Sequence, residues 1–79
     1  MEKKAKRSYF KDEEALLRIG QKIRKMRISN GMSQESLSFE CELDYSQINR
    51  MELGKVNFTI SNLYRIAKVL NVHPKDFLD

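Results

Sequence analysis

The chain has 79 residues, a formal net charge of +4, one cysteine and one histidine. This length predicts one small domain, near the lower limit for a chain that folds by burying apolar side chains alone. One cysteine excludes an intramolecular disulfide, and one histidine without partners at ligand spacing indicates no metal site. No apolar run reaches the roughly 18 residues of a membrane span, and the amino terminus lacks the apolar segment of a signal peptide. We therefore expect a soluble cytoplasmic protein without a cofactor or a membrane partner.

Residues 1–11 hold the whole excess of positive charge, with five basic side chains against one glutamate. Because this segment has a charge run and no apolar period, we predict a mobile basic arm at 1–11 and a folded domain at 12–79. The arm either follows DNA phosphates or a minor groove, or it only aids solubility, and the sequence leaves both open. We also expect Tyr9 and Phe10 to pack back onto the domain.

The first helix is expected to begin at about Asp12, a suitable N-cap, and to end at Gly31, which is placed for the left-handed C′ conformation. The basic residues on its outer face are interpreted as mostly solvated, with at most one of them touching phosphate: Arg18, Lys22, Arg24 and Lys25. The buried stripe follows the helical period and consists of Leu16, Ile19, Ile23 and Met26.

Two short helices follow with almost no connection between them. Ser33 is a good N-cap for the earlier one, because its hydroxyl can accept a bond from an orphaned N–H. Leu37 and Cys41 recur at a spacing of four, so both should face the core, and Cys41 should be structural. We expect Phe39 to pack against neighbouring helices.

The second short helix should begin at Asp44, because Asp44 followed by Gln47 is a capping-box pattern, and it should carry Ile48 and Met51 inward. With so short a connection, the two helices must cross steeply. Its outward side chains carry hydroxyl, amide and guanidinium groups that can meet base edges or phosphates: Tyr45, Ser46, Asn49 and Arg50.

Two closing helices are predicted after the loop at residues 53–58. Thr59 should cap the longer one, whose free N–H groups form a ready anion site. His73 and Pro74 predict an N-cap and first residue of a last short helix at 74–78. One of the last two apolar residues, Phe77 and Leu78, should be core. The inward residues of the longer helix are expected to be Ile60, Leu63, Ile66, Ala67 and Leu70.

Together these residues resemble the phage-repressor-type (Xre, lambda-repressor-like) helix-turn-helix family over roughly residues 16–79. The resemblance implies an all-α, five-helix fold. Two positions depart from the family pattern, since Glu42 replaces the usual turn glycine and Ser38 the usual alanine. A left-handed backbone at Glu42 would cost roughly 1–2 kcal/mol. The matching residues are Ile19-Gly20, Ile23, Met26-Arg27, Gly31 to Glu35, Ile48, Arg50, Glu52, Gly54-Lys55, Asn57, Leu63, Ile66-Ala67, Leu70, Val72 and Phe77-Leu78.

The resemblance implies a sequence-specific transcriptional regulator that binds double-stranded DNA as a homodimer, with its recognition helix in the major groove. The dimer is expected to form around residues 71–79. Arg50 is the best candidate for two bonds to a guanine. Arg27 and Glu52 are expected to form a structural ion pair. The predicted DNA-contacting residues are Gln34, Tyr45, Ser46, Gln47, Asn49, Arg50, Lys55, Asn57 and Thr59.

Two other classes of function have less support in the sequence. The same fold could serve as a protein-binding module, such as an antitoxin with a small protein partner. Such a protein would show extra apolar surface, for which only Tyr9, Phe10 and Phe39 qualify. An enzyme has the least support, because the sequence offers one histidine, one cysteine expected to be buried, and no recognisable pair of acids.

Overall fold

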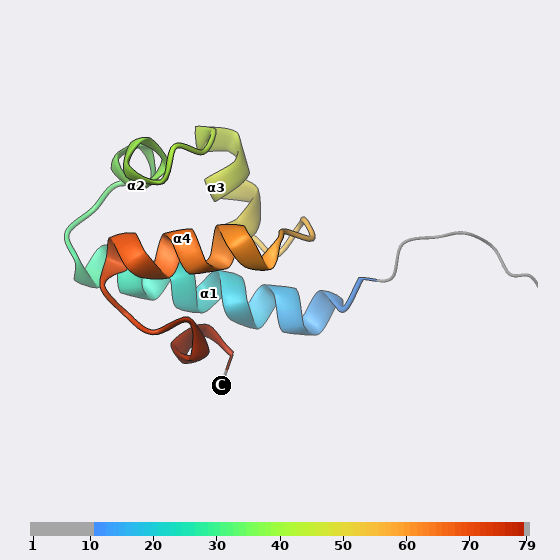
Figure 1. Cartoon of the computed structure of the whole chain (residues 1–79). Helices are drawn as coiled ribbons and strands as arrows, with labels where there is room; N and C mark the ends of the chain where they lie inside the picture. The colour runs from blue at the N-terminus through green and yellow to red at the C-terminus, as the bar shows by residue number, and fades with distance from the viewer. Residues whose placement is uncertain (1–10, 79) are drawn as a thin grey trace, which may run out of the picture.

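The computed structural model describes residues 11–78, so the predictions for most of the arm lie outside the described part. Figure 1 shows α2 and α3 on one side of α1 and α4, with η1 on the other side. The described residues contain no β-strand, and the all-α fold class is confirmed. The elements are α1 (Glu13–Ser29), α2 (Gln34–Cys41), α3 (Tyr45–Glu52), α4 (Ile60–Leu70) and the 3₁₀ turn η1 (Pro74–Phe77).

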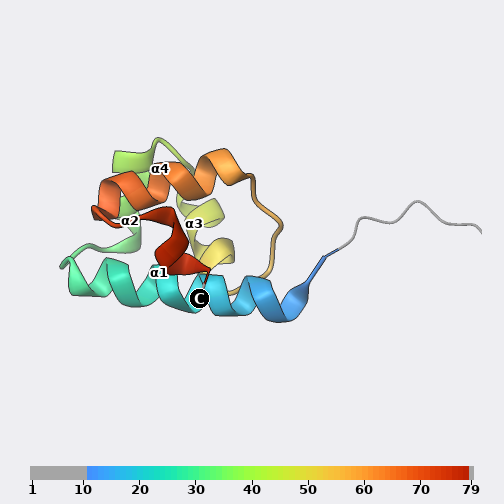
Figure 2. The same cartoon turned by 60° about the horizontal axis from the view of Figure 1, so that its bottom comes forward.

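The prediction of a fifth α-helix at 74–78 is wrong. The described part of the chain has four α-helices, and a 3₁₀ turn takes the place of the fifth. The N–H of Asp76 bonds to the carbonyl of His73 at 2.9 Å, and that of Leu78 to the carbonyl of Lys75 at 3.0 Å. Both bonds span three residues, which is the 3₁₀ pattern. The turn packs against α1 and α4 (Figure 2) and buries Phe77, whereas Leu78 is exposed.

The N-termini of α1, α2 and α4 carry the side-chain caps that the sequence predicts. Asp12, Ser33 and Thr59 each accept a bond from the backbone N–H three residues later, at 3.0 Å. The predicted N-cap of the last turn is also present, because the Nδ1 atom of His73 accepts from the N–H of Lys75 at 3.1 Å. These bonds satisfy donors that a helix leaves without partners.

The predicted capping box at Asp44 is wrong. Asp44 precedes α3 in an extended conformation, but its side chain makes no capping hydrogen bond. The N–H of Gln47 bonds instead to the backbone carbonyl of Asp44 at 3.0 Å. The donor that the carboxylate would have capped is thus already satisfied by the main chain.

The core lies between α1, α2, α3, α4 and η1. The predicted inward residues of α2 and α3 are fully buried, and Leu16 and Ile23 are buried on α1, with Ile19 and Met26 packed at the edge. The core residues of the central cluster are Ile23, Leu37, Cys41, Ile48, Met51, Leu63, Ile66, Ala67, Leu70 and Phe77.

Two residues expected to pack inward are exposed instead. Phe39 is 81% exposed and Ile60 is 67% exposed. Phe39 lies two residues from Leu37 along α2, which at 3.6 residues per turn places it on the opposite face. Ile60 is the first residue of α4 and lies at the edge of the buried stripe, on the side of exposed Tyr64.

Close backbone contact places α3 on α1. A Cβ atom on Gly20 would collide with the main-chain carbonyl of Met51 and would lie 2.7 Å from that of Glu52. Gly54, just after α3, has a φ of +71°, and a Cβ there would lie 2.7 Å from the Cα of Leu17. Only glycine permits both approaches, so these two positions set the distance of α3 and its following loop from α1.

The turn between α2 and α3 contains the left-handed residue anticipated from the family pattern. Glu42 has a φ of 57°. The N–H of Leu43 closes the turn by bonding to the carbonyl of Ser38 at 3.0 Å. Ser38 fits where alanine is usual, because its hydroxyl donates to the carbonyl of Glu35 at 2.8 Å. The turn sends α3 off in a direction plainly different from that of α2 (Figure 1).

Candidate nucleic-acid interface

The expected ion pair between Arg27 and Glu52 is present and buried. The Nε atom of Arg27 donates to Oε2 of Glu52 at 2.6 Å, and Nη2 donates to Oε1 at 3.0 Å. The hydrogen bond to Glu52 raises the pKa of Arg27 above its ordinary value, although burial acts in the opposite direction. Two parallel bonds fix both the distance and the orientation between α1 and the end of α3.

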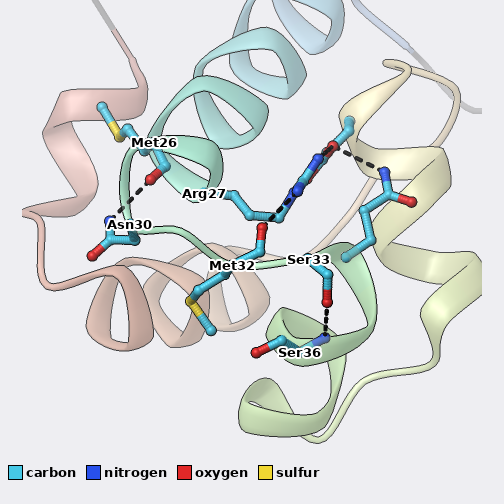
Figure 3. A network of polar contacts seen from close by, with 8 residues as sticks. Met26, Arg27, Asn30, Met32, Ser33 and Ser36 are labelled. Carbon is cyan, nitrogen blue, oxygen red and sulfur yellow. Dashed lines mark hydrogen bonds and ion pairs between the residues drawn. The ribbon is translucent and has the colours of Figure 1, made fainter.

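This pair also holds the start of α2. The Nη1 atom of Arg27 donates to the carbonyl of Met32 at 2.8 Å, as Figure 3 shows. The side-chain amide of Gln34 donates to Oε1 of Glu52 at 2.9 Å. Three elements therefore meet at one charge pair, and Gln34 joins the start of α2 to the end of α3. A phosphate contact by Gln34 stays a prediction.

The outward face of α3 carries the polar groups predicted from the sequence. Ile48 and Met51 are fully buried on the opposite face, so the helix is anchored without using these groups. Arg50 lies in the last turn of α3. Tyr45, Ser46 and Arg50 are exposed, whereas Gln47 and Asn49 are half-buried.

The remaining predicted residues follow α3 in the chain. Lys55 and Asn57 are exposed in the loop, and Thr59 is exposed at the start of α4. The N–H of Lys55 bonds to the carbonyl of Arg50 at 2.9 Å, which ties the loop to α3. The hydroxyl of Thr59 accepts a bond from the backbone N–H of Asn62 and so caps α4, and a DNA contact by Thr59 stays a prediction.

Arg24 is a candidate that the sequence interpretation did not single out. It lines an open groove of about 560 Å³ that the α1, α2 and α3 segments share. No periodicity distinguishes Arg24, because the exposed face of α1 carries several basic residues. The groove is lined by Arg24, Arg27, Ser33, Gln34, Glu35 and Tyr45.

The positive charges of the candidate surface lie on α1, at the end of α3 and in the loop after it, and none lies on α2. Residues 28–49, which include all of α2, contain four acidic side chains and no Lys, Arg or His. Exposed cations are supplied by Arg24 on α1, Arg50 on α3 and Lys55 in the loop. A polyanion approaching this surface would therefore be attracted to α3 and its flanks rather than to α2.

No arrangement for metal binding or thiol chemistry emerges from residues 11–78. That part of the chain contains no group of three or more His, Cys, Asp or Glu side chains able to hold a metal ion. Burial raises the pKa of the Cys41 thiol from its ordinary 9.0 to about 11.

Arg65 donates to the carbonyl of Cys41 at 2.9 Å, a contact between α4 and α2 that no sequence pattern indicates. Among the described helices, none is long and apolar enough to cross a membrane.

Comparison with known proteins shows that this chain is similar to helix-turn-helix proteins. A family model described as helix-turn-helix matches residues 23–77. The control protein C.BamHI of Bacillus amyloliquefaciens is 47% identical over 64 residues, which cover 80% of this chain and 79% of that protein.

Solved structures share the same architecture. The restriction-modification controller protein C.AhdI from Aeromonas hydrophila is 33% identical, with a TM-score of 0.79 over 81% of this chain and 97% of that chain. The biofilm master regulator SinR, solved in complex with DNA, is 29% identical, with a TM-score of 0.73 over 77% of this chain and 98% of that chain. The chain belongs to the helix-turn-helix family of DNA-binding transcriptional regulators.

Proposed function

We propose that this protein is a cytoplasmic, controller-type regulator that binds a two-fold DNA site as a homodimer, with α3 in the major groove. The observation that carries the proposal is the presentation of α3. Its buried face and the Arg27–Glu52 pair fix the helix, while Ser46 and Arg50 remain exposed on the outer face. A rigid helix with outward polar groups is what reading base edges requires.

Within this proposal Arg50 supplies the main base contact. A guanidinium offers two parallel donors, which match O6 and N7 of guanine and no other base edge. Arg50 is exposed and its backbone is held by the bond from Lys55, so the side chain can reach outward from a fixed origin. Ser46, Gln47 and Asn49 are proposed to make secondary contacts to bases or phosphates.

Phosphate contacts are proposed on both sides of α3. On one side lies the groove that brings Arg24, Gln34 and Tyr45 together. On the other side are Lys55 and Asn57, followed by the N-terminus of α4. Such contacts fix the register of a protein on the duplex, whereas the base contacts select the sequence.

The dimer is proposed to use the surface formed by α4 and the chain after it. A single module of this size buries little surface on DNA, whereas two modules engage half-sites about 34 Å apart. Tyr64 lines a groove of about 480 Å³ on this surface. Leu78, four residues after the groove-lining Pro74, is exposed. The groove is lined by Ser61, Tyr64, Arg65, Ala67, Lys68, Val72 and Pro74.

Analytical ultracentrifugation with and without a palindromic site from a binding-site selection tests this function. We expect two chains per site, and Tyr64→Asp should shift the protein toward a monomer and weaken cooperative binding. The matched control is Gln21→Asp, which introduces the same charge at an exposed position of α1. A wild-type protein that stays monomeric and binds its best site one-to-one would contradict the dimer.

One observation favours a second candidate function, a protein-binding module such as an antitoxin. Phe39 is the most exposed large apolar side chain among the described residues. A small protein partner could cover it. Tagged wild-type protein and Phe39→Ala, purified from the native host, would then differ in a stoichiometric co-purifying partner. Identical material from both would remove this candidate.

A further inference from the structure

An open groove whose lining includes two half-exposed leucines lies where α1 begins beside the loop that follows α3. Leu17 is 45% exposed and Leu53 is 50% exposed, so both leave part of an apolar side chain in water. Gly54, in the loop after α3, lies close to the backbone of Leu17 on α1, so the loop and the start of α1 form the two sides of the groove. The groove has a volume of about 490 Å³ and is lined by Lys11, Glu13, Leu17, Leu53, Gly54 and Lys55.

The covalent chain brings two aromatic residues to this groove. Lys11 lines it, and the residues directly before Lys11 are Tyr9 and Phe10, which lie outside the described part. Consecutive Cα atoms are about 3.8 Å apart, so the Cα atom of Phe10 is about 3.8 Å from that of Lys11, which lines the groove. Tyr9 and Phe10 are the only aromatic residues among the first ten. Each such side chain can bury about 150–250 Å².

We propose that Tyr9 and Phe10 dock into this groove and cover Leu17 and Leu53. The driving force is burial of apolar surface on both partners, and the loss of chain freedom is small because the segment is already tethered at Lys11. Docking also fixes where the basic residues of the arm leave the domain, at the end of the groove that Lys55 shares. The docking itself does not depend on the proposed binding to DNA.

The test is methyl NMR of the full chain without DNA, at a concentration where the protein's oligomeric state is known. We expect nuclear Overhauser effects from the rings of Tyr9 and Phe10 to the methyl groups of Leu17 and Leu53. The double variant Tyr9→Ala/Phe10→Ala should shift those methyl signals and lower the Tm by on the order of 4 °C. The matched control is Phe39→Ala, which removes an exposed ring from α2 and should leave these leucine signals unchanged.

Three results would overturn the docking. One is the absence of ring contacts at Leu17 and Leu53 together with unchanged methyl signals in the double variant. Another is the appearance of the contacts only after duplex DNA is added, which would make the docking a consequence of DNA binding. The last is a set of contacts between differently labelled copies, which would place the aromatic residues of one chain in the groove of another.

Discussion

Arg27 and Glu52 form a buried, two-bond ion pair between the last turn of α1 and the last residue of α3. Gln34 adds a third bond to the same carboxylate from the first residue of α2. The orientation of α3 therefore depends on one buried charge pair at its last residue. Loss of the pair should affect folding and DNA binding together.

Removal of one partner should be costly. Arg27→Met leaves the carboxylate of Glu52 buried without its cation, which should cost about 3–5 kcal/mol of unfolding free energy. The double variant Arg27→Met/Glu52→Leu should be less destabilised than Arg27→Met alone, because no buried charge remains. Urea denaturation of the wild type and both variants measures this. A loss below about 0.5 kcal/mol in Arg27→Met would show that the pair has no structural weight.

The left-handed turn residue predicts a stabilising substitution. Glu42→Gly relieves a conformation that costs roughly 1–2 kcal/mol for a residue with a Cβ, but it adds about 0.5–1 kcal/mol of chain entropy to the unfolded state. We therefore expect a net gain of roughly 0.5–1 kcal/mol. Glu40→Gly, at the exposed penultimate residue of α2, is the matched control and should lose up to about 1 kcal/mol. If both variants lost stability equally, the turn would not be strained.

Much of this arrangement can be predicted from the sequence because it depends on local chemistry. Ser33 and Thr59 cap helices because hydroxyl groups satisfy orphaned N–H donors, and that requirement is visible in the residue order. The Arg27–Glu52 pair spans 25 residues and has no local signal, so it could be expected only from resemblance to a family.

The features that sequence patterns do not predict share a physical cause, since they depend on tertiary neighbours. Asp44 does not act as a side-chain cap because a backbone carbonyl already takes the donor. Ile60 follows the apolar period of α4 but lies where the core has ended. The contact of Arg65 with the carbonyl of Cys41 joins two helices whose packing no short pattern specifies. Arg24 likewise becomes a candidate only once three helices surround one groove.

The buried thiol predicts a loss of stability in alkaline solution. The pKa of Cys41 is raised from 9.0 to about 11, so the folded state keeps its proton where the unfolded state releases it. This contribution is fully present below pH 9 and is lost as the pH rises to about 11, by up to roughly 3 kcal/mol.

Cys41→Ala isolates that effect from other groups that titrate at high pH. The difference in unfolding free energy between the wild type and Cys41→Ala should shrink between pH 9 and pH 11. In the wild type, a thiol reagent at pH 8 should react with Cys41 only after unfolding. Rapid labelling of the native protein, or a difference independent of pH, would contradict the buried and protonated thiol.

The basic arm is predicted to contribute by neutralising DNA phosphates. Deletion of residues 1–8, which removes Lys3, Lys4, Lys6 and Arg7, should flatten the slope of log affinity against log salt by about 0.9 for each phosphate that the arm neutralises. The ranking of DNA sequences should hardly change, because phosphates carry no base information. Titrations at a series of salt concentrations measure the slope. An unaltered slope would leave the arm with a role in solubility only.

Arg50 is proposed to be the residue through which α3 reads DNA sequence. Arg50→Ala should weaken binding to the preferred site by about 1–3 kcal/mol and should relax selectivity at one base position, repeated by symmetry in the second half-site. Arg50→Lys should also be impaired, because an ammonium lacks the planar pair of donors. Lys55→Ala is the matched control, because Lys55 is proposed to contact phosphate and its removal should weaken binding to all sequences alike.

The most direct measurement is a binding-site selection from random duplexes, carried out in parallel on the wild type, Arg50→Ala and Lys55→Ala. We predict that the wild type and Lys55→Ala select the same two-fold motif, and that Arg50→Ala loses its preference for guanine at one symmetric position. An unchanged motif in Arg50→Ala, with affinity reduced equally on every sequence, would contradict base recognition by Arg50 and would make its side chain a phosphate contact.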